Sequence, residues 1–437
     1  AAFSQPRRAS GMRPALLAAG ALALLGVREV AAWNRTQKGW NLRRAYVLTA
    51  DGRAQEQAWI KFRLLSWNCL AEAWTTFGGQ NKELHEDLRW KARLPRILRE
   101  LQARAPHIAV LQELEDYAYH WDVLPRLKAM GYHGIYSSSS QTHVGLAVLW
   151  KVDRFFLSTS MEVNLGEPFQ SRWYLSMAEH LSQQQQDRYL LLSSNRVALF
   201  AVLVPRALEQ KPKRHALLLC AAHLSSIVQE PPIGLDLQVF QAVLLIEALE
   251  SMVRQLAEKQ ISVSVILAAD LNTQTSYPQS VMDEMSLQAS GSKLESVSGA
   301  TVPSPVYQLF TQGFLTEDAI GFVVLALSAG GWQPSAMMFS AFREMLVAEW
   351  PECALHSAYK QALGSEPPTC VAEVPEQADY VLSRPASGDV ARLALLGLLV
   401  PPRRMPYADV IRGIGSDHVP LVCDFALLRP PASEDAA

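Results

Sequence analysis

The sequence has few cysteines, and they match neither a structural zinc site nor a redox pair. No CxxC pair occurs, and no spacing of Cys and His is typical of zinc binding. We therefore expect reduced or core thiols. Three of them stand in apolar segments, and the full set is Cys69, Cys220, Cys353, Cys370 and Cys423.

Motifs of several common enzyme classes are also absent. The chain has no G-x-S-x-G elbow, no Walker A loop and no G-x-G-x-x-G in front of a predicted helix. These motifs position a nucleophilic serine, a triphosphate and a dinucleotide on strand–turn–helix units. The sequence therefore gives no support for serine hydrolysis, nucleoside triphosphate binding or dinucleotide binding.

The chain also lacks an excess of charge of either sign. Charged residues make up 19% and hydrophobic residues 49%, and the formal net charge is −2. This composition supplies a globular core but no overall field that attracts nucleic acid or anionic lipid. A site for a polyanion would need local basic clusters, for which the candidates are Arg89–Arg104 and Lys211–Arg214.

No apolar run is long enough for a comfortable membrane span. The segment Met12–Trp33 has an Ala/Leu run that Arg28 and Glu29 interrupt, and no acidic residue precedes Glu29. We expect residues 1–40 to be a secretory or organelle-targeting leader. The alternative is a packed N-terminal helix or short hydrophobic segment on a cytoplasmic protein. Residues 429–437 are a C-terminal tail.

Residues 58–428 are predicted to form one domain of alternating strands and helices. The length alone suggests about three domains. However, polar residues at strand ends are scattered from Asn68 to His418, and they have to converge in one unit to form a site. Helical spacing is clearest in Leu84–Leu101 and Asp236–Leu256.

The clearest predicted strand is Ile261–Asn272, an apolar run that ends in two polar residues. A run without Gly or Pro favours a strand that is covered on both faces. Alternation then points Asp270 and Asn272 to the same side. Asp and Asn also end strands as ordinary turn residues, so this strand alone does not indicate a site.

Other apolar runs end in the same manner, and the polar residues at their ends form a coherent set. Carboxylate and amide oxygens without cysteine suit a hard cation such as Mg²⁺, with Mn²⁺ as the alternative. Histidines can hold phosphoryl oxygens or a developing negative charge. The set is Asn68, Glu113, His223, Asp270, Asn272, Asp379, Asp417 and His418.

The order of these residues resembles the endonuclease/exonuclease/phosphatase superfamily. The motifs are Trp67-Asn68, Leu111-Gln112-Glu113, His223-Leu224, Asp270-Leu271-Asn272, Asp379-Tyr380 and Ser416-Asp417-His418. The segments LPRLKAMGYHGIY, SPVYQLFTQGFL and HSAYKQALGSEPPT are similar to the deadenylase branch of nocturnin, Angel and the carbon-catabolite-repression nucleases. The resemblance implies an α/β fold, a four-layer α/β sandwich with two mixed β-sheets packed face to face and helices outside.

The resemblance also implies which residues hold the metal. Glu113 is the principal ligand, Asn68 lies beside it at the metal and the phosphate, and Asp417 supports the metal side. Phosphoryl transfer depends on positioning and on charge neutralisation, so a magnesium site of this kind suits the chemistry.

The resemblance also implies catalytic roles for the remaining residues. Asp270 orients or deprotonates the attacking water, and Asn272 helps to fix the scissile phosphate. His418 contacts the phosphoryl oxygens while Asp379 holds its ring in one tautomer, and His223 is a second phosphate contact.

The expected function is a Mg²⁺-dependent phosphodiesterase, a 3′-to-5′ exoribonuclease acting on single-stranded RNA. Deadenylases carry a Phe and a Pro that sandwich an adenine, but Val374 and Val228 stand in those places, so poly(A) specificity is not expected. One alternative is a phosphatase or diesterase acting on a small phosphorylated metabolite such as NADP(H). Another is a non-catalytic RNA-binding scaffold. Nothing in the sequence indicates an oligomeric state.

Overall fold

The computed structural model places two large sheets and their covering helices. It describes residues 30–32, 45–49, 58–75, 82–139, 141–165, 196–209, 214–226, 228–229, 232–233, 235–281, 283, 301–329, 353–371, 376–386, 391–402 and 406–429.

The first sheet has eight strands in the order β1-β2-β17-β18-β3-β4-β6-β5. Strands β3 and β4 run parallel, and the other pairs are antiparallel, so the sheet is mixed. The strands are β1 (Val30–Ala32), β2 (Ala45–Leu48), β3 (Ala58–Asn68), β4 (Ile108–Glu115), β5 (Tyr132–Ser138), β6 (Val144–Lys151), β17 (Arg392–Leu399) and β18 (Leu421–Leu428).

The second sheet has six strands in the order β15-β16-β12-β9-β8-β7, with β9 and β12 parallel. Its strands are β7 (Phe155–Asn164), β8 (Val197–Pro205), β9 (Arg214–His223), β12 (Ile261–Asp270), β15 (His356–Ser357) and β16 (Asp379–Arg384). Two short hairpins, β10 (Val228–Gln229) with β11 (Pro232–Ile233) and β13 (Ser276–Pro278) with β14 (Thr301–Pro303), lie outside both sheets.

The two sheets pack face to face, and strand alternation decides which side chains lie between them. On β12, Ile266 and Ala268 belong to a core that both sheets share, whereas Val265 and Leu267 belong to a second core on the opposite face. Burial on both faces explains the continuous apolar run that the sequence shows here, as predicted.

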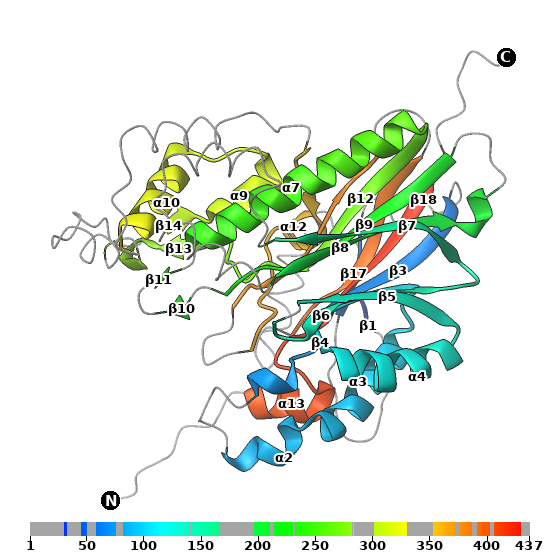
Figure 1. Cartoon of the computed structure of the whole chain (residues 1–437), viewed down its shortest axis with the longest axis horizontal. Helices are drawn as coiled ribbons and strands as arrows, with labels where there is room; N and C mark the ends of the chain where they lie inside the picture. The colour runs from blue at the N-terminus through cyan, green and yellow to red at the C-terminus, as the bar shows by residue number, and fades with distance from the viewer. Residues whose placement is uncertain are drawn as a thin grey trace, which may run out of the picture.

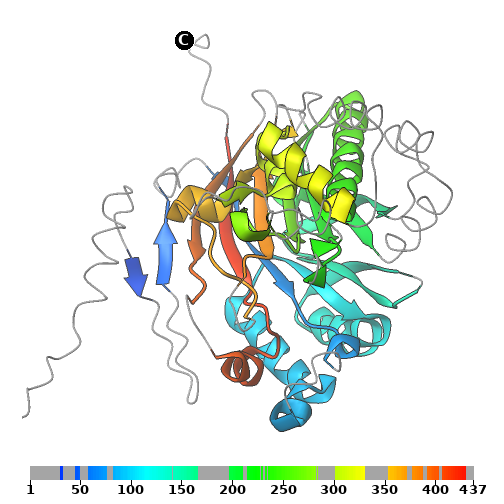
Figure 2. The same ribbon diagram turned by 90° about the vertical axis from the view of Figure 1, so that its left-hand side faces the viewer.

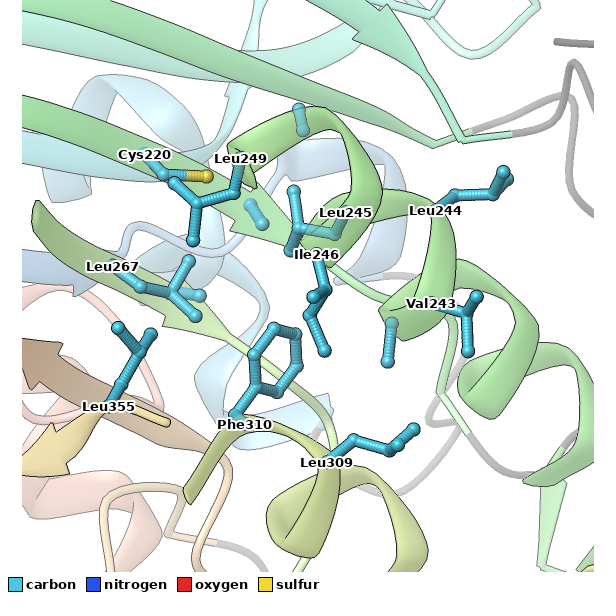
Figure 3. Close-up of a cluster of buried hydrophobic side chains, with 14 of the residues drawn as sticks. Cys220, Val243, Leu244, Leu245, Ile246, Leu249, Leu267, Leu309, Phe310 and Leu355 are labelled. Carbon is cyan, nitrogen blue, oxygen red and sulfur yellow. The ribbon is translucent and has the colours of Figure 1, made fainter. Parts of the chain in front are cut away.

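Helices cover the outer face of each sheet (Figure 1). The six-stranded sheet is covered by α7 (Leu235–Glu258), α9 (Pro305–Gln312) and α10 (Glu317–Ala329), and the eight-stranded sheet by α3 (Trp90–Arg104), α4 (Leu124–Ala129) and α13 (Tyr407–Ile414). Figure 3 shows Leu245 and Leu249 of α7 packed near Cys220 and Leu267 of the sheet. The predicted four-layer α/β sandwich is confirmed.

The remaining described helices are short and lie in the connections. They are η3 (Glu72–Trp74), η4 (Lys82–Leu84), α2 (His85–Leu88), η5 (Ala118–Val123), η7 (Arg206–Leu208) and α12 (Ala358–Leu363). The prediction of a single helix over Leu84–Leu101 is wrong in one respect. The helix is interrupted at Arg89, whose backbone is extended, so that α2 and α3 are separate helices. Glu72 accepts a hydrogen bond from Trp90 N and so caps the helix that begins there.

The N-terminal part of the chain adds strands to the large sheet. Strand β2 pairs with β17, β1 pairs with β2, and both lie before residue 58, along one edge of the molecule in Figure 2. Apart from β1, the expected leader lies outside the described residues, as does the tail after Arg429. None of the helices in the described ranges is both long and apolar enough to cross a membrane.

Candidate active site

Polar side chains from both sheets converge at one end of the space between them. In the six-stranded sheet, Asp270 lies opposite His223 on one neighbouring strand and opposite Asp379 on the other. Each lies two residues along its strand from a side chain of the core between the sheets: Ala268, Ala221 and Val381. Strand alternation therefore directs all three toward the other sheet.

The eight-stranded sheet contributes Asn68, which joins carboxylates from both sheets. Its Nδ2 donates to Glu113 Oε1 at 2.9 Å and to Asp270 Oδ2 at 2.8 Å. Its Oδ1 accepts from Leu70 N at 2.9 Å, which fixes the amide orientation. Asn68 is only 1% exposed, so these hydrogen bonds form away from bulk water.

Glu113 reaches the site only because its strand is irregular. Regular alternation would place Glu113 with Leu111, which packs in the core beneath α3 and α4. Instead, the β4–β6 pairing shifts between Leu111 and Leu114, and Glu113 has a left-handed backbone with φ of 55°. A bulge of this kind re-aims a side chain at the cost of backbone strain. Its Oε2 accepts from Ala71 N at 2.9 Å.

His418 is held from two directions. Its Nδ1 lies 2.7 Å from Asp379 Oδ2, and Trp67 Nε1 donates to the His418 carbonyl oxygen at 2.8 Å. Thr369 Oγ1 accepts from Asp379 N at 3.0 Å and anchors the backbone of Asp379. The pair Asp379–His418 is buried, so its geometry is set before any substrate arrives.

His223 lies between the two carboxylates and the partly buried guanidinium of Arg196. Its Nε2 is 3.7 Å from Glu113 Oε1 and 3.6 Å from Asp270 Oδ2, and its Nδ1 is 3.1 Å from Arg196 Nη1. Burial, and then the charge of Arg196, hold the pKa of His223 well below its ordinary value. This pKa shift favours the neutral ring. His223 and Arg196 line a small cleft with Trp74, Thr142 and Val144.

The sequence-based set of site residues omitted Arg196. It stands at the end of a polar segment with no periodic pattern, directly before β8. Strand pairing supplies the missing signal, because β8 runs antiparallel to β9 and Ala198 pairs with Ala222. A residue just before β8 must then lie beside the end of β9, where His223 stands.

Burial disfavours the ionised forms of the carboxyl groups of Glu113 and Asp270. It raises the pKa of Glu113, and burial followed by the charge of Asp379 raises the pKa of Asp270 to about 7. Burial alone would favour a neutral His418, but Cys370 and Asp379 outweigh it and raise the pKa of His418 well above its ordinary value. Added positive charge would therefore stabilise the ionised carboxylates.

The donor set fits a hard divalent cation. Ligand atoms of Glu113, His223 and Asp270 lie within 4.8 Å of one another, and so do those of Asp270, Asp379 and His418. Asp379 Oδ1 and Asp417 Oδ1 are buried and accept no hydrogen bond from any residue in the described ranges. Oxygen-rich sites with unsatisfied carboxylates are those that Mg²⁺ prefers.

Asn272 and Asp417 lie at the edges of the site. Strand β12 ends at Asp270, and Asn272 follows with a left-handed backbone, φ 49°, so alternation does not extend to it. Its Nδ2 donates to Leu224 O at 2.9 Å, and its N donates to Asp270 Oδ1 at 2.9 Å. The prediction that strand alternation points Asp270 and Asn272 to the same side is therefore wrong, because the strand has ended before Asn272. Asp417 directly precedes His418.

Arg89, Lys91 and Arg99 of the predicted basic cluster are exposed, but its other arginines are buried or paired within the protein. Arg93 is fully buried and donates to Leu88 O, Cys69 O and Gly415 O at 2.7, 2.8 and 3.1 Å. Arg96 bonds Asp87, and Arg104 bonds Glu100. The guanidinium groups of Arg93 and Arg96 donate to carbonyl and carboxylate oxygens of other segments and so join those segments to α3. Of the second cluster, residues 211–213 lie outside the described residues.

Solved structures with the same fold include proteins of the branch that the sequence resembles. The structure of the human nocturnin catalytic domain with bound sulfate has a TM-score of 0.50 at 19% sequence identity. The alignment covers 88% of this chain and 97% of the nocturnin chain. ANGEL2, a 2′,3′-cyclic phosphatase, has a TM-score of 0.55 at 18% identity, covering 89% and 99%. Its complex with adenosine-2′,3′-vanadate has a TM-score of 0.52 at 19% identity, covering 84% and 96%.

None of the curated proteins compared with this chain matches it in sequence. The model of the Endonuclease/Exonuclease/phosphatase family matches residues 65–418, a range that begins on β3 and ends at His418. This range covers most of the chain and includes every polar residue predicted for the site. The chain therefore belongs to the endonuclease/exonuclease/phosphatase family.

Proposed function

We propose that this protein is a Mg²⁺-dependent phosphodiesterase that removes nucleotides from the 3′ end of single-stranded RNA. The observation that supports this most is the arrangement around Asn68, whose one amide holds carboxylates from both sheets. Family membership supports phosphoric-ester hydrolysis as the reaction class. The buried pair Asp379–His418 supplies a positioned imidazole beside them.

Glu113 is the proposed principal metal ligand, with Asn68 and Asp417 beside it. Burial raises the pKa values of Glu113 and Asp270 and so disfavours their ionised forms. The charge of a bound cation would stabilise these ionised forms. When bound, Mg²⁺ neutralises charge on the phosphoryl group and aligns it for attack. Mn²⁺ has similar ligand preferences and is the alternative.

Asp270 is the proposed base that orients or deprotonates the attacking water. Without a cation the pKa of Asp270 is raised to about 7, and a bound cation would lower it, so that the carboxylate is ionised and can accept a proton near neutral pH. Asn272 N donates to Asp270 Oδ1, which leaves Asp270 Oδ2 on the side of Asn68. We propose that the Asn272 side chain helps to fix the scissile phosphate.

His418, His223 and Arg196 are the proposed contacts to phosphoryl oxygens. Asp379 binds Nδ1 of His418 and so orients the ring, which leaves Nε2 as the nitrogen for substrate. Arg196 offers several N–H groups and a permanent charge, as a phosphate contact requires. Anion binding by related folds supports this, since nocturnin was solved with sulfate and ANGEL2 with a vanadate.

The base preference is expected to be weak. Stacking a base on an aromatic ring contributes about 1–3 kcal/mol, and a valine offers no such ring. Val228 lies on β10, and Val374 lies outside the described residues. We expect oligo(A) and mixed-sequence RNA to be degraded at similar rates, and Val374→Phe to raise the preference for adenine.

A small phosphorylated metabolite such as NADP(H) remains the second candidate substrate. The observation that favours it is the pairing of Arg93, Arg96 and Arg104 within the protein, which removes much of the expected basic surface. If RNA is the substrate, binding should weaken with salt at a log–log slope of about −0.7 per phosphate contacted.

The experiment compares 5′-labelled oligo(A), mixed RNA, circular RNA and NADP⁺, with Mg²⁺ and with a chelator. Stepwise shortening of both linear RNAs, with no cleavage of the circle, is the expected result. Hydrolysis of NADP⁺ alone, without salt dependence, would support the metabolite substrate. RNA binding without turnover of any substrate would contradict an enzymatic role.

A further inference from the structure

A cysteine that the proposed mechanism does not use lies against two residues that it does use. Ligand atoms of Cys370, Asp417 and His418 are all within 4.8 Å of one another. Cys370 is partly exposed and forms no disulfide. Sulfur, imidazole nitrogen and carboxylate oxygen together are ligands typical of zinc rather than of magnesium.

Backbone hydrogen bonds hold this group in place. Cys370 forms an isolated β-bridge with His418, Val371 N donates to the Asp417 carbonyl at 2.8 Å, and Val419 N donates to the Thr369 carbonyl at 2.8 Å. The two segments are therefore joined on both sides of Cys370. The backbone therefore holds the residues that carry the three side chains next to one another.

A second observation points to a ligand at this position. Asp417 Oδ1 is buried, and no residue in the described ranges donates a hydrogen bond to it. A buried carboxylate oxygen without a donor is unfavourable, and a cation relieves it. His418 is oriented at the same place by its hydrogen bond to Asp379, as metal-binding histidines commonly are by a carboxylate.

We propose that Cys370, Asp417 and His418 form an inhibitory site for Zn²⁺ or another thiophilic divalent cation. Tetrahedral zinc with bonds of about 2.0–2.3 Å needs ligand atoms about 3.3–3.8 Å apart. Ligand atoms within 4.8 Å reach this spacing through small side-chain rotations. The thiol proton passes to solvent as the sulfur binds.

The inhibitory effect rests on the proposed function. A zinc ion at this site occupies His418, the proposed phosphate contact, and Asp417, which supports the Mg²⁺ side. Magnesium does not compete for the sulfur because it prefers oxygen ligands. Zinc therefore inhibits at concentrations at which Mg²⁺ is in large excess.

Binding is tested first, without any assay of turnover. Co²⁺ is titrated into the full chain, and thiolate-to-cobalt absorption is followed in the near ultraviolet. The wild type should show the band, and Zn²⁺ should abolish it. Cys370→Ser should lose it, whereas Cys353→Ser, which changes a thiol outside the group, should keep it. No band in the wild type, or a band that survives in Cys370→Ser, would overturn the proposal.

Inhibition is tested next on Mg²⁺-dependent hydrolysis. Cys370→Ser keeps the approximate size and hydrogen-bonding capacity of the side chain, and the activity of each protein without zinc is the reference against which its inhibition is measured. The half-inhibitory Zn²⁺ concentration of Cys370→Ser should rise by at least about 100-fold, since loss of an outer-shell partner alone costs 10–100-fold. Equal inhibition of both proteins would contradict the inhibitory role. A cobalt band in a protein without turnover would support the metal site and contradict the proposed function.

Discussion

Asn68 Nδ2 donates a 2.9 Å hydrogen bond to Glu113 Oε1, although a regular sheet would hold the two side chains on opposite faces. In the parallel pairing of β3 and β4, Asn68 lies opposite Gln112, so Gln112 shares its face and Glu113 should not. The left-handed backbone at Glu113 reverses that direction. Backbone strain at this position therefore brings a proposed metal ligand into the site.

The pair Asp379–His418 gives a prediction for turnover. Asp379→Asn keeps the shape of the side chain but removes the negative charge that holds the His418 ring, and an amide can also donate where the carboxylate only accepts. We expect kcat to fall by about two to four powers of ten with little change in Tm. Steady-state kinetics and thermal unfolding measure the two effects. A near-normal kcat would show that the two residues do not act together.

Arg196 gives a prediction for a residue that the sequence-based set omitted. Arg196→Met keeps most of the side-chain volume and removes the charge beside His223. If Arg196 contacts the phosphoryl group, kcat/KM should fall by about 10²–10³-fold, the loss typical of one electrostatic donor. Arg206→Met is the control, because Arg206 is half-exposed on η7 and lies outside the site. Equal kinetics in both variants would argue against a substrate contact.

Sequence patterns were sufficient to locate most of the central strands. Apolar runs that end in polar residues placed Asn68, His223 and Asp270 at the ends of their strands, and Asp379 was expected to open one, as the structure has them. The family and the four-layer fold are confirmed, since their motifs are spread over most of the domain. The proposed roles of these residues remain predictions.

Other features could not be predicted because no local pattern encodes them. The bulge at Glu113 depends on pairing with β6, and the turn at Asn272 depends on Asp270 and Leu224. Arg93 was placed on an exposed face because charged residues usually are exposed. Its burial follows from backbone carbonyl groups that approach it from distant segments, which a helical pattern does not show.

Arg93 gives a prediction for stability. Its guanidinium donates to carbonyl groups of three segments, and Arg93→Met would leave those acceptors buried without a donor. We expect a loss of about 2–4 kcal/mol in the free energy of unfolding, measured by denaturant titration. Lys91→Met on the exposed face of the same helix should change it by about 0.5 kcal/mol or less. Similar losses in both variants would contradict the structural role of Arg93.

His215 gives a prediction for stability against pH. It is 1% exposed, and burial lowers its pKa from 6.5 to about 4. The unfolded chain therefore binds more protons below pH 6.5, so His215 makes the folded state less stable as pH falls toward 4. His215→Gln removes this titration, and its stability relative to wild type should rise by up to about 3 kcal/mol between pH 7 and pH 4. A difference that does not change with pH would show that His215 is not buried in its neutral form.

The most direct test of the central claim is hydrolysis of single-stranded RNA by the wild type and by Glu113→Gln, each with Mg²⁺ and with a chelator. The variant keeps the shape of Glu113 and its place at the bulge, but an amide does not balance the charge of the cation. We predict Mg²⁺-dependent shortening of RNA by the wild type and none by Glu113→Gln, with the fold intact by circular dichroism and Mg²⁺ binding lost in calorimetry. Equal Mg²⁺ binding and equal hydrolysis by a folded Glu113→Gln variant would contradict the claim.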